Sequence, residues 1–521
     1  MEETYHANVK TPLIRQQEPI NFDHENGLTI PTQGQNSSRA PTKNMTPFFI
    51  VVVLERFTYY SIVISLFFFF CDDVYLIKDK TTSNTTNVDV TVLCIVGLSW
   101  MFCVLGGVLS DAKLGKRGTI TLGLFVYAIG IGFLLICAAA FEEGMIGKQY
   151  SYRMTMVMAS FILILFGEGA YKANISAFGA EQLNSKDVDS TRRYFDIYYF
   201  YLNIGAMLAV IISAYIQTRQ GFFIGYIAPT ATIVLAFFIF LFSSHLYTIV
   251  PHEQMVGKVF QIFKDARRKR HQNERSLSLP LQQKLSWLDY ARIKYGGSYL
   301  DWEVDEVQFL VMVIPVLVVL LPFAIIYSQM NATFLNQGLQ MKLPFEYSSF
   351  PVAWLLFFNI FIILILLPIM NRFVYPWLKR HGYNMAPLTR ISIGIVLSCF
   401  AVIAAGFVEI FVIQDFTENN TIEVKQTDNN STKAANLTIF LQVPQYLFVG
   451  LGEIFAYIGG LDFAYRNAPR SMQGLVMSSN FVIDSVGSLL GSGLLKLSVL
   501  IHLVKRKRKG EPYDLTYYFL Y

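Results

Sequence analysis

The sequence predicts an all-α membrane protein built from two six-helix halves. Hydrophobic residues make up 53% of the 521-residue chain, and phenylalanine alone occurs 44 times. Charged residues make up only 15%, against roughly 25% in a typical soluble domain. A chain with so few charges cannot cover a water-exposed surface, so its apolar excess must face lipid. This excludes a nucleic-acid-binding protein, a cytosolic enzyme and a disordered scaffold.

Eleven stretches of the chain are long and apolar enough to cross a bilayer, which takes about 20 residues in a helix. They are 47–71, 89–109, 118–141, 153–178, 194–217, 222–246, 307–328, 349–370, 388–413, 439–460 and 473–504. Six precede a long polar stretch and five follow it. The closing residues, Asp514–Tyr521, read as the start of another apolar helix. We therefore expect two sets of six helices with the last helix truncated.

This pattern divides the chain into five segments. They are a cytosolic N-terminal tail (1–46), a first bundle of spans one to six (47–246), a cytosolic linker (247–306), a second bundle of spans seven to eleven (307–504), and a basic segment with the start of an incomplete span twelve (505–521). The first 45 residues contain no apolar run of signal-peptide length, so we expect the N-terminus to stay in the cytosol.

The distribution of basic residues supports this orientation. With the N-terminus inside, 26 Lys and Arg residues fall on the cytosolic side and 7 on the outside. Such an excess on the cytosolic side is the usual bias of membrane proteins. One cluster, Lys505–Lys509, follows span eleven and would lie outside. Either that span is shorter and irregular, or the end of the chain is not native.

Potential N-glycosylation sites provide a second check of the topology, because the modification occurs outside the cytosol. Five Asn-x-Ser/Thr triplets fall in the first and fifth outside loops, at Asn84, Asn419, Asn429, Asn430 and Asn436. The cluster between 415 and 437 is what a luminal or extracellular loop would carry.

Ionisable residues inside spans are costly in lipid, so each is a candidate functional residue. The first span carries Glu55 and Arg56, and Arg56 needs an anionic partner, either a nearby acid or the carboxylate of a substrate. Span four carries Glu168 and Lys172, which share one helix face at i and i+4 and could pair. The alternative is that such pairs only hold helices together.

The second half contributes acids. Span ten contains Glu453 and, at its cytosolic end, Asp462, while span eleven contains Asp484. Basic groups in one half facing an acid in the other suit a zwitterion held by both ends. Asp484 is either structural or functional on this reasoning, and Asp462 fits a cap or loop contact.

The segment between spans two and three combines paired glycines with charge. Gly106 and Gly107 allow close helix approach, and Asp111, Lys113 and Arg117 could form a cytosolic charge latch that opens in one state. A plain solvated turn is the alternative.

Several segments, in order along the chain, resemble the proton-coupled oligopeptide transporter (POT/PTR) family of the major facilitator superfamily. Glu55–Tyr60 resembles its ExxERFxYY motif, Gly106–Gly115 its GGxxADxxLG loop, Phe178–Leu183 its FGADQF, Tyr198–Gly205 its FYxxINxG, and Gly452–Met472 its tenth-helix region. The outside loop between spans nine and ten holds only about 24 residues. This layout resembles that of the peptide/histidine transporter subgroup most.

This resemblance implies a peptide site in a cavity between two six-helix halves. Arg56 and Lys172 would receive the peptide carboxylate and Glu453 its amino end. The other implied contacts are Tyr59, Tyr60 and Asn203.

One departure from the family motif concerns proton coupling. The family has a glutamate three residues before Glu55, where this chain has Val52, but it gains Glu168 one helical turn from Lys172. Our hypothesis is that Glu168 replaces the missing carboxylate, so proton coupling would involve Glu55, Glu168, Lys172 and Glu453. The rival is that coupling is weakened or lost.

The predicted function is secondary active transport of di- or tripeptides, with histidine as a further candidate, together with protons. Alternatives are a carrier of another small anion or amino acid, or a non-transporting endolysosomal sensor that holds a cytosolic signalling adaptor. The expected membrane is the plasma membrane or the endolysosome. The sequence contains no nucleophile–base constellation, nucleotide loop or metal spacing, so we expect no enzyme activity, cofactor, metal or nucleic-acid partner.

Overall fold

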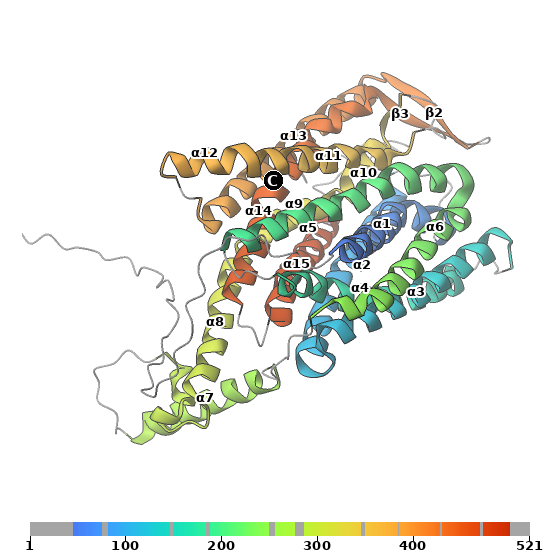
Figure 1. The fold of residues 1–521 in the computed structure, drawn as a ribbon. Helices are drawn as coiled ribbons and strands as arrows, with labels where there is room; N and C mark the ends of the chain where they lie inside the picture. The colour runs from blue at the N-terminus through green and yellow to red at the C-terminus, as the bar shows by residue number, and fades with distance from the viewer. Residues whose placement is uncertain are drawn as a thin grey trace, which may run out of the picture. The chain divides into compact units, whose positions relative to one another are not determined.

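The structure is a computed structural model, and it describes residues 45–74, 82–145, 150–183, 188–248, 256–276, 286–344, 350–383, 385–427, 430–468 and 473–500 (Figure 1). Most of the N-terminal tail, Asn429 and the segment 505–521 lie outside these residues, as do the side chains of Asn84 and Asn430. The expectations for those positions stay predictions.

Long helices account for nearly all of the described chain. The first half contains α1 (Thr46–Phe69), α2 (Thr82–Leu109), α3 (Gly115–Glu142), α4 (Tyr150–Glu181), α5 (Val188–Leu208) and α6 (Ala214–Ser243). The second contains α8 (Asp301–Val318), α9 (Leu321–Gln329), α10 (Thr333–Gly338), α11 (Leu356–Ile369), α12 (Tyr375–Arg380), α13 (Pro387–Thr417), α14 (Val443–Asn467) and α15 (Gln473–Leu500). One further helix, α7 (Val256–Ser276), lies between them in the sequence.

The helical runs match the predicted spans. Eight described runs are long and apolar enough to cross a membrane, or nine with the bent pair Asp301–Val318 and Leu321–Gly338. Two of the eight, Val88–Glu142 and Arg193–Leu246, have 55 and 54 residues. Each would be about 80 Å long as one helix, against a hydrocarbon core of about 30 Å. Gly115 and Gly221 interrupt them with φ of 66° and 84°, so each run is long enough for two spans. The division into eleven spans stays a prediction.

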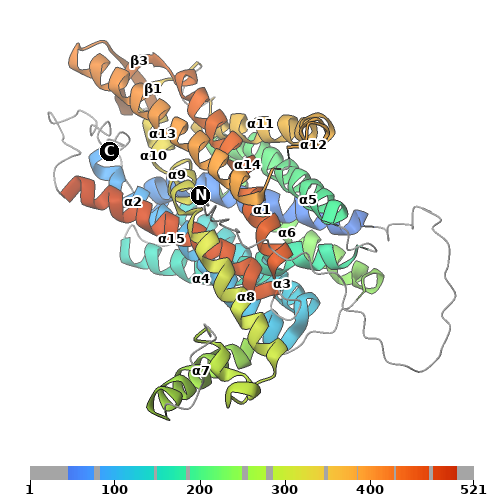
Figure 2. The same cartoon turned by 90° about the vertical axis from the view of Figure 1, so that its left-hand side faces the viewer.

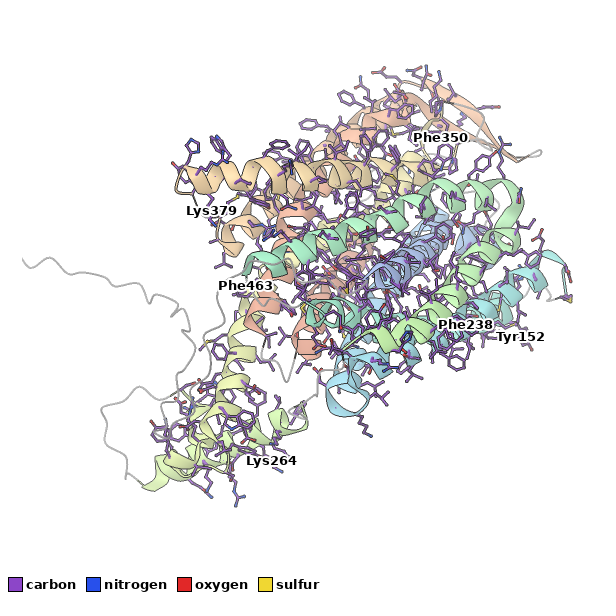
Figure 3. All side chains as sticks on the ribbon, viewed as in Figure 1. Tyr152, Phe238, Lys264, Phe350, Lys379 and Phe463 are labelled. Carbon is purple, nitrogen blue, oxygen red and sulfur yellow. The ribbon has the colours of Figure 1, made fainter. Side chains whose placement is uncertain are left out.

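Large apolar side chains cover the outer faces of these helices, as expected for contact with lipid. Tyr152 and Phe238 point outward (Figure 3) and are 65% and 45% exposed. Isolated exposed apolar residues are normal in soluble proteins, but here they recur along α3, α6, α8 and α13. The arrangement is that of a multi-pass membrane protein.

Glycines bring α2, α3 and α4 into close contact. A Cβ added to Gly106 would lie 2.5 Å from the carbonyl oxygen of Gly169, and one added to Gly167 would lie 2.4 Å from the backbone nitrogen of Tyr127. Only residues without a side chain permit this backbone approach. The predicted packing role of Gly106 agrees with this geometry. The close contact fixes the position of α4, and with it Glu168 and Lys172, relative to α2 and α3.

Span seven is broken rather than continuous. α8 and the run formed by α9 and α10 meet at an angle of 50°, and Pro322 follows the break. Proline cannot donate the backbone hydrogen bond that a continuous helix needs, so the break persists. The bend lets α9 pack against α15.

The loop between spans nine and ten forms a small sheet that the sequence did not predict. β2 (Thr421–Thr427) pairs antiparallel with β3 (Asn430–Thr438), and β1 (Met341–Lys342) pairs parallel with β3. Asn419 and Asn436, two predicted glycosylation sites, are exposed at this sheet. Their glycosylation stays a prediction.

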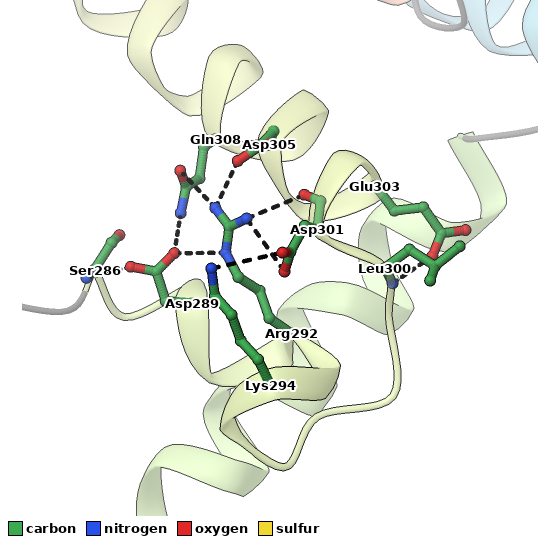
Figure 4. A network of polar contacts seen from close by, with 9 residues as sticks. All are labelled: Ser286, Asp289, Arg292, Lys294, Leu300, Asp301, Glu303, Asp305 and Gln308. Atoms are coloured by element: carbon green, nitrogen blue, oxygen red, sulfur yellow. Dashed lines mark hydrogen bonds and ion pairs between the residues drawn. The ribbon is translucent and has the colours of Figure 1, made fainter. Parts of the chain in front are cut away.

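Arg292, in the predicted cytosolic linker, organises the entry to α8 (Figure 4). Its Nε donates to Asp289 Oδ1 at 2.8 Å, and its Nη2 donates to Asp305 Oδ1 at 2.5 Å and to Gln308 at 3.4 Å. Burial raises the pKa of Asp289, but hydrogen bonds from Arg292, Gln308 and the Ser286 backbone outweigh it, so the pKa lies below its ordinary value. The network ties the linker to the first turns of α8.

Replacing Arg292 with methionine is expected to speed amide hydrogen exchange in residues 286–308 by roughly tenfold or more, since a hydrogen bond to a charged group is worth about 1.5–3 kcal/mol. The wild-type segment should also loosen in acid, because a depressed carboxylate pKa stabilises the fold above the unfolded pKa and loses that effect as pH falls through the folded value. Lys294→Met is the control. Lys294 is half exposed, and its 3.5 Å ion pair with Asp301 is longer and more exposed to solvent than the bonds of Arg292, so its loss should have little effect. Equal exchange in both variants would contradict the prediction.

Candidate functional site

A cavity lies among helices of both halves. The polar and aromatic residues that line it are Arg56, Tyr59, Tyr60, Trp100, Lys172, Ser176, Tyr198, Tyr199, Tyr327, Asn331, Glu453, Tyr457 and Phe481. They come from α1, α2, α4 and α5 in the first half and from α9, the segment after it, α14 and α15 in the second.

Five of the six predicted substrate contacts line this cavity: Arg56, Tyr59, Tyr60, Lys172 and Glu453. Asn203 is not among the lining residues. It is 1% exposed, and its side-chain amide donates to the backbone oxygen of Tyr199 on the same helix, at 2.9 Å. The structure therefore places Asn203 behind the tyrosines of α5.

Arg56 is bound to its own neighbour in the sequence. Its Nε and Nη2 donate to the two carboxylate oxygens of Glu55, each at 2.6 Å, and its guanidinium carbon lies 4.6 Å from the centre of the Tyr59 ring. Glu55 is 0% exposed and does not line the cavity. A two-point arginine–carboxylate pair is the strongest ordinary ion pair, so Glu55 fixes where the guanidinium faces the cavity.

Lys172 lies in an aromatic cage that draws on both halves. Its Nζ is 4.7 Å from the Tyr59 ring centre, 4.8 Å from that of Trp100 and 5.3 Å from that of Phe481. Ring faces attract cations at such distances. The Trp100 indole also donates to the Tyr59 hydroxyl at 3.2 Å, which holds two of the rings together.

The predicted pairing of Lys172 with Glu168 is present in the structure. Lys172 Nζ and Glu168 Oε1 are 3.4 Å apart, and Glu168 is 1% exposed. Val52, where the family motif has a glutamate, is buried at 1% exposure. Since 3.4 Å is long for a charge-assisted hydrogen bond, the ammonium is held as much by the rings as by Glu168.

Glu453 supplies the negative wall of the cavity from the second half. The Tyr199 hydroxyl of α5 donates to its Oε1, and the Asn359 amide of α11 lies 3.4 Å from its Oε2. Glu453 is 3% exposed. The Tyr199 contact crosses from one half to the other, so the same carboxylate lines the cavity and bridges its two sides.

Several residues that line the cavity were not predicted from the sequence. Trp100, Phe481 and Tyr327 are aromatic residues in a chain that is 15% aromatic, so nothing in the sequence distinguished them. Tyr199 lies within the Tyr198–Gly205 motif but was assigned no role from the sequence. Polar-tipped aromatic residues within apolar spans are the signal that could have found the tyrosines.

Hydrogen bonds join the two halves at both ends of α2. Near one end, Asn336 of α10 donates to Asp89 Oδ2 at 2.9 Å. Beyond the other end, in the π-helical turn η2 (Ser110–Leu114), Asp111 Oδ2 accepts from the backbone N–H of Leu475 at 2.9 Å. Trp100 lies midway, about 16 Å along the helix from each acid. The cavity therefore lies between two cross-half contacts.

The predicted latch residues have different surroundings. Asp111 is 4% exposed and reaches the second half, as described above. Arg117 Nη2 donates to the hydroxyl of Ser244 at 2.7 Å, so it ties α3 to the end of α6 within the first half. Lys113 is exposed. Lys116, which was not predicted, forms an ion pair with Glu181 at the end of α4.

Replacing Asp111 with alanine is expected to move the protein toward a state open at the predicted cytosolic side. The bond to Leu475 is charge-assisted and worth about 1.5–3 kcal/mol, so the shift should be roughly tenfold or more. Electron spin resonance distances between labels at the exposed positions 114 and 380 would measure it. Lys113→Ala is the control, and an unchanged distance distribution in Asp111→Ala would contradict the assignment.

Comparison with known proteins identifies the family. A model described as the POT family matches residues 117–509. The mouse protein "Solute carrier family 15 member 3" is 30% identical over 86% of this chain and 82% of its own length. The Arabidopsis thaliana protein "NRT1/ PTR FAMILY 8.1" is 26% identical over 88% of this chain and 85% of its own.

Solved structures with the same fold are also POT transporters. An auto-inhibited POT family peptide transporter superposes with a TM-score of 0.68 at 21% identity, covering 91% of this chain and 93% of the other. The POT family transporter PepTSo has a TM-score of 0.68 at 20% identity, covering 92% and 94%. The major facilitator fold that the sequence predicted is confirmed. The chain is thus a multi-pass membrane transporter rather than an enzyme, and it belongs to the POT family.

Proposed function

We propose that the chain moves small zwitterionic peptides across the membrane together with protons, by alternating access. The observation that carries the proposal is the polarity of the cavity. Arg56 and Lys172 of the first half present cations, and Glu453 of the second half presents an anion. A dipeptide has a carboxylate at one end and an ammonium at the other, so it can satisfy both walls at once.

The lining also fits the middle of a peptide. Six tyrosines surround the cavity, and their hydroxyls can donate to or accept from a peptide bond. They are Tyr59, Tyr60, Tyr198, Tyr199, Tyr327 and Tyr457. Aromatic faces accept side chains of many shapes, which suits a carrier with a broad range of peptides. The solved structure described as an auto-inhibited POT family peptide transporter supports the same substrate class.

Alternating access requires contacts that break on one side at a time. The Asp89–Asn336 bond and the Asp111–Leu475 bond join the halves on opposite sides of the cavity. Opening one while keeping the other would expose the cavity to one compartment. Glu453 lines the cavity and accepts a hydrogen bond from Tyr199 of the other half. Substrate bound to Glu453 can therefore change a contact between the two halves.

Glu168→Gln is expected to reduce the acid stimulation of peptide uptake by roughly tenfold, the equivalent of about 1.4 kcal/mol. The variant keeps the shape of the side chain but cannot exchange a proton, and it leaves Lys172 without its partner at 3.4 Å. Uptake measured against external pH tests this, with Thr155→Ala, an exposed polar change on the same helix, as the control. A pH profile of uptake identical to that of wild type would show that Glu168 does not take part in proton coupling.

The function itself is best tested by reconstituting the full chain in liposomes with an imposed proton gradient. Labelled dipeptide should accumulate inside, and unlabelled tripeptide should compete. Labelled histidine, nitrate and a single neutral amino acid in separate vesicles test the other substrates. Binding of dipeptide without flux under any gradient would instead favour a sensor that holds a cytosolic partner.

A further inference from the structure

Asp484 is a buried acid that the proposed mechanism does not yet use. It lies on α15 and is 3% exposed, and its Oδ2 has no hydrogen-bond partner among the described residues. α15 packs against α2 of the first half and α9 of the second (Figure 2). A charged carboxylate would be strongly disfavoured in such a place without a partner.

The charged groups that face Asp484 are few. Lys172 of α4 and Glu453 of α14 act on it electrostatically. The weaker acids near it are Cys103 of α2 and Tyr457 of α14. α9 carries no charged residue.

Asp89 of α2 lies about 21 Å along that helix from Cys103, and other charged neighbours of α15 lie toward its start. Asp111 of η2 meets the backbone of Leu475, about 14 Å along the helix from Asp484. The acids of α8 fall in that helix's first turns, at Asp301, Glu303, Asp305 and Glu306. Among the described residues, Lys172 is therefore the cation whose charge acts on Asp484.

The position of Phe481 shows how near that cation is. Phe481 is three residues before Asp484, so the two side chains share a face of α15. The Phe481 ring centre is 5.3 Å from Lys172 Nζ. Lysine has a flexible four-carbon stem, so the ammonium can swing from Glu168 toward Asp484 without leaving its aromatic cage.

The charge balance around the cavity favours a neutral Asp484 in this arrangement. Arg56 is paired with Glu55, and Lys172 is paired with Glu168. Glu453 already contributes one carboxylate that has no cation bound to it among the described residues. An ionised Asp484 would add a second buried negative charge with no hydrogen bond to Oδ2.

We propose that Asp484 is a second protonation site, which holds a proton while Lys172 is paired with Glu168 and binds Lys172 across the boundary between the halves once that proton is lost. The O–H bond of Asp484 breaks, the proton passes to water, and the Lys172 ammonium pairs with the new carboxylate. Glu168, left without a cation, takes up a proton from water, so the net charge is unchanged. The proposal rests on the proposed proton-coupled function and deepens it.

Asp484→Asn, which imitates the protonated form, tests the proposal in liposomes. Exchange of labelled for unlabelled dipeptide without a gradient should persist, because the residues that face the cavity are intact. Accumulation driven by a gradient of one pH unit should fall by roughly tenfold. One proton moving down such a gradient supplies the free energy for a tenfold concentration ratio of peptide, and this contribution is lost in the variant. Asp484→Glu should restore it. Ser488→Ala, a buried uncharged change one turn further along α15, should match wild type.

Proton counting on the purified protein gives a readout that needs no transport. In an alkaline titration followed by an indicator dye, Asp484→Asn should release about one proton fewer than wild type, as expected when one titrating carboxyl is removed. Equal counts would overturn the proposal, as would gradient-driven accumulation at the wild-type level in Asp484→Asn. If Asp484→Glu also loses exchange, Asp484 has a structural role instead.

The proposed function can fail separately from this inference. Wild-type vesicles that take up no dipeptide under any gradient would mean that peptide transport is wrong. The proton count of wild type against Asp484→Asn would then still decide whether Asp484 is a protonation site.

Discussion

Replacing Arg56 with methionine is expected to abolish peptide uptake and to lower the free energy of unfolding by about 3–5 kcal/mol. Arg56 is 4% exposed and holds both oxygens of Glu55 at 2.6 Å. Removing the guanidinium leaves Glu55, which is 0% exposed, as a buried charge without its partner. Thermal unfolding in detergent and dipeptide uptake in liposomes measure the two effects.

A double variant separates the structural from the functional role of this pair. In Glu55→Gln with Arg56→Met both charges are gone, and replacing a whole buried ion pair is often close to neutral for stability. Stability should therefore recover, while uptake stays lost because Lys172 alone remains for the substrate carboxylate. Uptake by the stable double variant would show that Arg56 serves only to neutralise Glu55.

The helical organisation could be predicted from the sequence because lipid imposes it directly. Each span must supply about 20 apolar residues, and each ionisable residue within a span has a cost that makes it conspicuous. Arg56, Lys172 and Glu453 were identified in this way before the family resemblance assigned them roles. All three line the cavity.

The contacts between these residues could not be predicted, because their partners carry no comparable mark. Phe481 and Trp100 complete the cage around Lys172, but they are two among many aromatic residues. The partner of Asp111 is a backbone N–H, which has no side-chain signature at all. Asn203 was expected in the cavity from its motif, yet its amide is used by its own helix.

Charge alone also left the role of Asp484 open. A lone acid in a span fits both a structural and a functional reading. Its place relative to the Lys172 cage depends on how α15 packs against α2, and that packing brings together residues almost 400 positions apart in the sequence. Only the three-dimensional arrangement shows that Asp484 faces a cation from the other half.

Glu453→Gln is expected to weaken binding of dipeptides with a free amino group by roughly 30-fold or more, since truncating one partner of a buried charge pair costs about 2–5 kcal/mol. The amide has nearly the same shape and can still accept from Tyr199 or from Asn359, but it no longer offers a negative charge to the ammonium. Competition of each peptide with labelled dipeptide for uptake gives the affinities.

An N-acetylated dipeptide provides the decisive comparison, because it has no ammonium for Glu453 to bind. Wild type should bind it poorly, and Glu453→Gln should bind it no worse, so the variant should lose most of its preference for the free amino group. Tyr199→Phe is the matched control: it keeps the carboxylate and removes only the hydroxyl that reaches it from the other half. Its preference should survive. If Glu453→Gln weakened both peptides equally, Glu453 would act by holding Tyr199 and Asn359 together, and the positive end of the substrate would need another partner.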